Sequence, residues 1–305
     1  MYRKLSLIIS SLMFLALTVT AYGQQVSCPF DGTDQNSLAR CLLRPVLRGG
    51  NLGPTPATIP APLNQLIGRP MTLDVVTVQR FLQARGIGEQ DLGGPFVFRG
   101  SRFEPDLTKA RFFIIHDTSS PEIAAPEFPA NINEASWPGN RLRTWLRLNV
   151  PTHVFVNRVG ESATKTNYIQ GVLATKFEIG LDKPRGAERA RARRERAGLF
   201  VNIELIQPRR KSRGSGFFDL APVPGMTQKQ LERLALLYVV ASVRAGHWLI
   251  PAFHCAVDTP LPNTHDDPQN FDMNVWLTSL RSLLAELTGS TPIPRSPLMQ
   301  LVGDA

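Results

Sequence analysis

Four short apolar segments, separated by stretches with helical spacing, are the feature that most limits how this chain can fold. They lie at 111–115, 154–157, 200–206 and 248–253, and each has the length and composition of a buried strand. The best helical pattern covers 227–245, where Thr227 and Gln230 have the spacing of a capping box, and a second one lies near 274–287. Strands that alternate with helices predict an α/β fold, with a central mixed β-sheet flanked by helices.

The first 23 residues have the pattern of a secretory signal peptide. Arg3 and Lys4 precede an apolar run over 5–19, and Ala21 and Gly23 have the small-residue spacing that a signal peptidase reads. An uncleaved membrane anchor is the alternative, but a run of about 15 residues is shorter than the roughly 20 that span a bilayer. We therefore expect export to the periplasm, or to the cell wall and the extracellular space.

The sequence divides into four parts. We expect the signal peptide at 1–23, an N-terminal extension at 24–108, an α/β domain at 109–288 and a C-terminal tail at 289–305. The extension is rich in proline and glycine, and one helix stands out in it near 72–85, with Thr72 as its predicted cap. With 305 residues, 43% of them apolar, the chain can bury a large core, which excludes an intrinsically disordered protein.

Export permits disulfide bonds, and the chain has three cysteines. Cys28 and Cys41 lie 13 positions apart in a polar stretch. A bridge between them would close a small loop and would stabilise the fold by about 3 kcal/mol. Cys255 is left over, and we expect it to be a buried, unreactive thiol.

The chain is basic, with a formal net charge of +9, and many of its arginines lie between 185 and 213. We interpret this stretch as a solvated loop, the Arg185–Arg213 loop. Two partners fit such a loop, namely a nucleic acid and an anionic surface such as cell wall or lipid head groups. Export favours the anionic surface, so we expect no nucleic-acid partner.

Two histidines occupy strand ends, where a rigid scaffold can hold a site. His116 ends the first apolar segment, and His254 follows the fourth. A polar turn with the sequence His-Asp-Asp-Pro comes shortly afterwards, at 265–268. Two histidines and one carboxylate are a donor set of catalytic zinc sites, which keep a further position open.

Glu204 lies inside the third apolar segment, and strand alternation places it on the same face as Asn202. Burying an isolated carboxylate is costly, so Glu204 needs a partner or a function. Two interpretations stay open. Glu204 is either ion-paired with the arginine cluster at 209–213 or a general base whose pKa burial raises.

Five segments, in this order along the chain, resemble the zinc-dependent N-acetylmuramoyl-L-alanine amidases, the type-2 amidases related to peptidoglycan recognition proteins. The resemblance covers about 109–285, in the strand at 113–119, the strand and turn at 152–160, the glutamate strand at 202–205, the helix at 227–245, and the Asp-Pro motif at 265–268 with Phe271 and Trp276. It implies an amidase-like α/β fold and hydrolysis of the amide bond between N-acetylmuramic acid and L-alanine.

The resemblance also assigns roles to residues. His116, His254 and Asp267 would bind Zn²⁺, with Asp266 as the alternative third ligand. Glu204 would orient or deprotonate the attacking water, and His265 would stabilise the oxyanion. We further expect the substrate to contact a set of polar residues on or beside the predicted strands, namely His153, Thr118 and Asn202.

Three departures from the family's pattern put the substrate in question more than the metal site, and one of them is a loop between His254 and Asp267 that is longer than in many relatives. The family has a His-Gly pair before the glutamate strand, where this chain has Phe-Glu-Ile-Gly at 177–180, and Gln269 stands where the family has glycine. The alternative function is a non-catalytic peptidoglycan-binding receptor of the same fold. A pure binder has no need of a complete zinc set together with Glu204, which favours the enzyme.

Overall fold

The structure is a computed structural model that describes residues 27–32, 34–99, 102–103, 107, 109–211, 218–259, 261–262 and 265–289. The predicted signal peptide and the predicted C-terminal tail beyond Gly289 lie outside these residues. Within the described ranges, no helix combines the length and the apolar character needed to cross a membrane.

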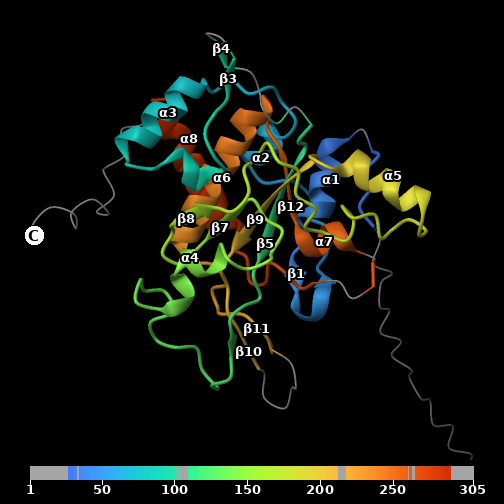
Figure 1. The fold of residues 1–305 in the computed structure, drawn as a ribbon, viewed down its shortest axis with the longest axis vertical. Helices are drawn as coiled ribbons and strands as arrows, with labels where there is room; N and C mark the ends of the chain where they lie inside the picture. The colour runs from blue at the N-terminus through green and yellow to red at the C-terminus, as the bar shows by residue number, and fades with distance from the viewer. Residues whose placement is uncertain are drawn as a thin grey trace, which may run out of the picture.

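A five-stranded mixed sheet forms the centre of the fold, with the strand order β12-β5-β9-β7-β8 (Figure 1). The strands are β5 (Phe112–Asp117), β7 (Val154–Val156), β8 (Ser162–Thr164), β9 (Phe200–Leu205) and β12 (Ile250–Phe253). Strand β8 is antiparallel to β7, and the other pairs are parallel. The four predicted strands are β5, β7, β9 and β12, so the prediction of a mixed central sheet flanked by helices is confirmed.

Both faces of this sheet are covered. Helix α6 (Gln228–Ala245) contacts α8 (Met273–Leu287). Tyr238 of α6 packs on Phe113 of β5, with 5.4 Å between the centroids of the two rings. The predicted capping box of Thr227 and Gln230 is present at the start of α6. Phe30, from the N-terminal region, packs on Phe112 at 5.4 Å. Since neighbouring strand residues point to opposite faces, these two contacts lie on opposite sides of the sheet.

The N-terminal extension packs into the same hydrophobic core as the sheet. Leu38, Leu42 and Leu63 are fully buried in one cluster with the β5 and β9 side chains. The predicted helix near 72–85 is α3 (Val75–Ala84), but its cap is Asp74, not Thr72. The Asp74 carboxylate accepts a hydrogen bond from the amide of Thr77 at 3.3 Å. This is the hydrogen bond that the residue just before a helix, the N-cap, makes to the third residue of that helix.

The remaining elements are short. The helices are α1 (Gln35–Leu42), α2 (Leu63–Leu66), α4 (Leu142–Trp145), α5 (Ala187–Arg196) and α7 (His254–Asp258), with 3₁₀ turns at Arg48–Gly50, Glu89–Leu92 and Pro138–Asn140. The strands are β1 (Val46–Leu47), β2 (Asn51–Leu52), β3 (Phe98–Arg99), β4 (Arg102–Phe103), β6 (Glu122–Ile123), β10 (Arg209–Lys211) and β11 (Phe218–Leu220).

The prediction of a loop from Arg185 to Arg213 is wrong for most of this stretch. Helix α5 carries the first arginine cluster, and Arg209 begins strand β10. Arg209 is 1% exposed and forms an ion pair with Asp117 at 2.8 Å, so it cannot serve a solvated basic surface. Residues 212–217, which include Arg213, lie outside the described ranges.

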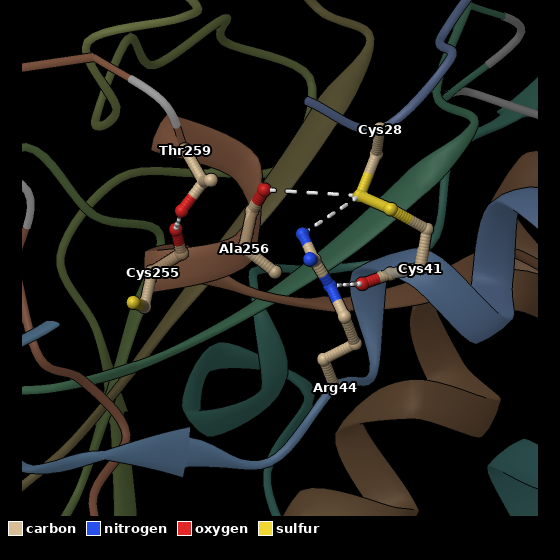
Figure 2. The surroundings of a disulfide bond; sticks show 6 residues. All are labelled: Cys28, Cys41, Arg44, Cys255, Ala256 and Thr259. Carbon is tan, nitrogen blue, oxygen red and sulfur yellow. Dashed lines mark hydrogen bonds between the residues drawn. A yellow bond between two sulfur atoms is a disulfide. The ribbon is translucent and has the colours of Figure 1, made fainter. Parts of the chain in front are cut away.

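The disulfide between Cys28 and Cys41 is formed, as the sequence predicts (Figure 2). It lies against α7, where the Cys28 Sγ atom is 3.9 Å from the carbonyl oxygen of Ala256. The buried Arg44 guanidinium donates a hydrogen bond to the carbonyl of Cys41 at 3.0 Å. Cys255, also on α7, is a buried free thiol, and its Sγ lies 3.4 Å from the carbonyl oxygen of Gly50. The N-terminal region therefore contacts α7 at Cys255 and Ala256.

Reduction of the Cys28–Cys41 bond should lower the free energy of unfolding by about 3 kcal/mol, because the unfolded chain regains the freedom that the closed loop removes. Urea unfolding with and without a reductant measures this difference. In the control, a Cys28→Ala/Cys41→Ala variant, the reductant should change nothing. An equal effect of the reductant on wild type and variant would show that the bond does not stabilise the fold.

Candidate metal centre

Three neighbouring strands bring the predicted site residues to one edge of the sheet. His116 lies near the end of β5 and is in register with Glu204 on β9, so the two side chains point to the same face. On the other side of β5, strand β12 ends at Phe253, which pairs with Ile115, and His254 follows directly as the first residue of α7. The apolar segments therefore position the site by their pairing register.

Asp267 reaches this edge from the turn that precedes α8. The amide of Cys255 donates to the Asp267 carbonyl at 3.0 Å, and the amide of Asp117 donates to Asp267 Oδ2 at 3.3 Å. The Gln269 amide in turn donates to Asp117 Oδ2 at 3.0 Å. These bonds attach the turn to the end of β5 and to α7, and they aim the Asp267 carboxylate at the two histidines.

His116, His254 and Asp267 form a buried group that could hold a metal ion, with donor atoms within 4.8 Å of one another. We call these three residues the metal-type group. Asp267 Oδ2 lies 2.9 Å from Nδ1 of His254 and 3.7 Å from Nδ1 of His116. The two imidazole rings are 4.5 Å apart, and none of the three residues is more than 6% exposed.

The far ring nitrogen of His116 is held by a buried relay of hydrogen bonds. The Asn202 side chain donates through Nδ2 to Glu178 Oε1 at 3.3 Å, which turns its Oδ1 toward His116. His116 Nε2 lies 2.9 Å from that oxygen, and an oxygen acceptor requires the ring proton on Nε2. The lone pair of a neutral His116 ring is therefore on Nδ1, which faces Asp267.

His254 has the same arrangement. Its Nε2 donates to Asp258 Oδ2 at 3.0 Å, four residues further along α7. Asp258 is held in turn by the amides of Lys176 and Phe177, at 3.0 and 2.9 Å. A carboxylate on the far nitrogen of a histidine is the typical outer partner of a metal-bound imidazole, because it fixes the tautomer and orients the ring.

The donor set fits a cation. The Nε2 protons of both histidines are donated to Asn202 and Asp258, so the lone pairs of neutral rings face the Asp267 carboxylate. The second oxygen of that carboxylate, Oδ1, is buried with no hydrogen-bond partner among the described residues. Burial disfavours the imidazolium of His254, but the charges and hydrogen bonds of Asp267 and Asp258 together outweigh burial and raise the pKa of His254 well above its usual value. Burial and the neighbouring His254 lower the pKa of His116 to about 3. The proton between His254 Nδ1 and Asp267 Oδ2 thus occupies a place suited to a metal ion bound by nitrogen and oxygen.

Glu204 lies beside this group with an unused oxygen. The residue is 8% exposed, and its Oε2 is buried without a hydrogen-bond partner in the described part of the chain. Burial, reinforced by the negative charge of Asp267, raises the pKa of Glu204 to about 8. The structure pairs Arg209 with Asp117 and gives Glu204 no ion pair within the described ranges, which favours the general-base interpretation over the ion-pair interpretation.

The adjacent carboxylates Asp266 and Asp267 point to different partners. Asp266 Oδ2 accepts from the amide of Gly49 at 3.3 Å, and its Oδ1 lies 3.8 Å from the guanidinium of Arg209. The metal-type group contains Asp267 and not Asp266. The structure therefore places the Asp267 carboxylate, and not that of Asp266, beside the two histidines.

Of the remaining predicted site residues, His265 and Thr118 are at least partly exposed, whereas Asn202 and His153 are buried. His265 is exposed, and its ring stacks on His254 at 4.8 Å, so it lies on the solvent side of the metal-type group. Thr118 is half-buried, follows β5 directly, and donates to the carbonyl of Ser120 at 2.8 Å. Asn202 orients His116 rather than facing outward, as described above.

His153 is engaged inside the fold. It is 1% exposed, and its Nδ1 accepts from the Asn202 amide at 2.9 Å. Its Nε2 donates to the carbonyl of Gln170 at 3.1 Å. Both ring nitrogens therefore bind backbone atoms, and the ring joins β7 to β9 and to the segment near 170.

The sequence interpretation missed the outer partners, Glu178 and Asp258, and the Asp117–Arg209 pair. Asp258 had one local signal, since it lies four residues after His254 and so shares a helix face with it. Glu178 lies in the Phe-Glu-Ile-Gly segment, at the point where the resemblance to the amidases departs. No spacing rule links Glu178 to Asn202 or Asp117 to Arg209.

Comparison of the chain with protein-family models, with curated proteins and with solved structures gives no match.

Replacing His116 with Ala should abolish metal binding, because it removes one of three donors from a buried site. Inductively coupled plasma mass spectrometry of zinc-loaded protein measures the occupancy. His247→Ala is the matched control, because His247 is half-buried, contacts the Ala245 carbonyl and is not part of the metal-type group. Full zinc occupancy in the His116→Ala variant would reject the ligand assignment.

Replacing Asp258 with Asn should weaken metal affinity about 10- to 100-fold, since His254 loses the charged acceptor that orients it. Competition with a chromophoric chelator measures the affinity. Asp182→Asn is the control, because Asp182 pairs with Arg196 outside the metal-type group. Unchanged affinity in Asp258→Asn would mean that Asp258 only holds the backbone of 176–177.

Proposed function

We propose that this chain is an exported zinc-dependent N-acetylmuramoyl-L-alanine amidase, which hydrolyses the amide bond between N-acetylmuramic acid and the L-alanine of the stem peptide. The observation that carries the proposal is the convergence of two imidazole nitrogens and the Asp267 carboxylate beside the buried, unpartnered carboxylate of Glu204. The five segments that resemble this family, in its order, support the choice of substrate.

His116, His254 and Asp267 would hold the ion, and three protein donors leave one position of a tetrahedral site open to substrate or water. When bound, zinc supplies Lewis acidity, which makes water a nucleophile near neutral pH and polarises a carbonyl oxygen. The protein's part is to keep the donors in place. Asn202 and Asp258 do so by holding the far ring nitrogens of the two histidines.

Glu204 serves as the general base in this proposal. Its Oε2 has no hydrogen-bond partner in the described part of the chain, so it is available to a water molecule at the site. Burial raises the pKa of Glu204 to about 8, and a carboxyl group with a pKa near neutrality can both accept a proton and give it up. It would take the proton of the attacking water and return it to the departing amine of the stem peptide.

His265 and Thr118 would contact the substrate. The exposed ring of His265, stacked on His254, carries an N–H that could donate to the developing oxyanion of the scissile carbonyl. Thr118 lies just beyond the end of β5, one residue after Asp117. The proposal does not assign substrate contact to His153 or Asn202, because both residues are buried with their polar side-chain atoms engaged inside the fold, whereas Thr118 is partly exposed.

Incubation with purified cell wall, with and without a chelator, tests the proposal. Mass spectrometry should detect free stem peptides that begin with L-alanine, the chelator should stop their release, and added zinc should restore it. Binding to cell wall without release of peptides, in zinc-loaded protein, would support the non-catalytic receptor instead. Neither binding nor release would reject peptidoglycan as the substrate.

The Glu204→Gln variant should lose at least about 100-fold in turnover while zinc stays bound, because the amide keeps the shape of the side chain but cannot accept the proton. Peptide release and zinc content are measured on the same preparation. Glu134→Gln, at an exposed position, is the control and should retain full activity. Loss of zinc from Glu204→Gln would assign Glu204 a structural role.

A further inference from the structure

Helix α5 presents a surface that the proposed hydrolysis does not use. Its ten residues contain five arginines, and α5 lies at the outer edge of the molecule (Figure 1). Two of the five are committed to the fold. Arg196 pairs with Asp182 and stacks over the ring of Phe177 at 3.6 Å, and Arg189 donates to the Lys183 carbonyl at 2.9 Å.

The helix is held closely against the protein body. Ala192 is buried, and Gly180 packs so near that a Cβ added there would lie 3.0 Å from the Arg189 carbonyl oxygen. Gly180 also has a φ of 77°, which favours glycine. Because one side of α5 is fixed, the orientation of its other side is also fixed.

The three remaining arginines, Arg191, Arg193 and Arg194, are exposed and point away from that contact. At about 100° per residue they occupy an arc of roughly 160° on the outer side of the helix. The other residues on this arc are Ala187 and Ala190, both exposed. We call the three arginines the arginine face.

The arginine face is weakly neutralised. Its one ion pair within the described residues joins Arg191 to Glu195 at 3.8 Å, with both side chains more than 65% exposed. Such exposed pairs contribute little, so all three guanidinium groups are available to a partner. Glu195 and Glu188 both lie beyond one edge of the arc, by the same helical geometry.

We infer that the arginine face is a docking surface for a linear phosphate polymer of the cell envelope. All three cations are arginines, whose planar forks bind phosphate oxygens in pairs, and alanines between them leave the forks accessible. A polymer that repeats its phosphate along the helix can contact the three groups together. Docking there would hold the enzyme at an anionic envelope without involving the metal centre.

The composition of the face favours this partner over a membrane or a single-stranded nucleic acid. A helix that binds in a bilayer interface carries large apolar side chains on its inserted side, whereas the apolar residues of α5 are all alanines. Binding of single-stranded nucleic acid uses aromatic side chains on which bases stack, and α5 contains none.

The test uses the full chain and soluble long-chain inorganic polyphosphate as the probe, with the dissociation constant measured at several salt concentrations. An Arg191→Gln/Arg193→Gln/Arg194→Gln variant should bind at least about tenfold more weakly, and the slope of log K against log salt should fall by about 2. Arg80→Gln/Arg141→Gln/Arg147→Gln removes the same charge from exposed positions elsewhere and should bind like wild type.

Three results would overturn the inference. Equal weakening in both triple variants would show that only net charge matters. Tighter binding of wild type to phosphatidylglycerol vesicles, or to DNA, than to polyphosphate at equal phosphate concentration would assign the face to a membrane or to a nucleic acid. Thermal unfolding shows whether either triple variant is misfolded. An Arg191→Gln/Arg194→Gln double variant, which should weaken binding less than the triple, replaces the tested triple in that case, and Arg80→Gln/Arg147→Gln replaces the control.

Discussion

The mutual approach of Asp267, His116 and His254 is the interaction on which the site depends. Three groups that each offer a lone pair are costly to bury together, because their charges and dipoles repel unless a cation or a proton lies between them. The fold nevertheless places Asp267 Oδ2 at 2.9 Å from one imidazole and 3.7 Å from the other. Asn202 and Asp258 hold the ring protons on the far nitrogens. The repulsion among the three groups is therefore relieved only when the histidines bind a cation or one of them is protonated.

The rest of the structure can be understood as support for this arrangement. The parallel register of β12, β5 and β9 sets the positions of His254, His116 and Glu204. The N-terminal region packs on α7, where the disulfide of Cys28 lies near the Ala256 carbonyl, so a segment more than 200 residues away in sequence helps to fix the helix that carries His254. The arginine face of α5 lies apart from these contacts, so it can bind a partner without occupying the proposed metal centre.

The strands and the long helices were predictable, because each has an apolar pattern that burial imposes on its sequence. Helix α5 was not, since a surface helix of arginine, glutamate and alanine has no apolar face to reveal its period. The cap of α3 was misplaced by two residues, because Thr72 and Asp74 are both good caps and the choice depends on where the chain turns. Asp266 and Asp267 are adjacent and chemically identical, so only the tertiary hydrogen bonds of their turn decide which one faces the histidines.

Diffraction at the zinc absorption edge, from crystals grown with zinc, tests the metal centre most directly. We predict one anomalous peak bonded to Nδ1 of His116, Nδ1 of His254 and a carboxylate oxygen of Asp267, at about 2.0–2.2 Å from each. A crystal without a peak at this position, in which His254 Nδ1 still shares a proton with Asp267, would contradict the assignment of a metal centre.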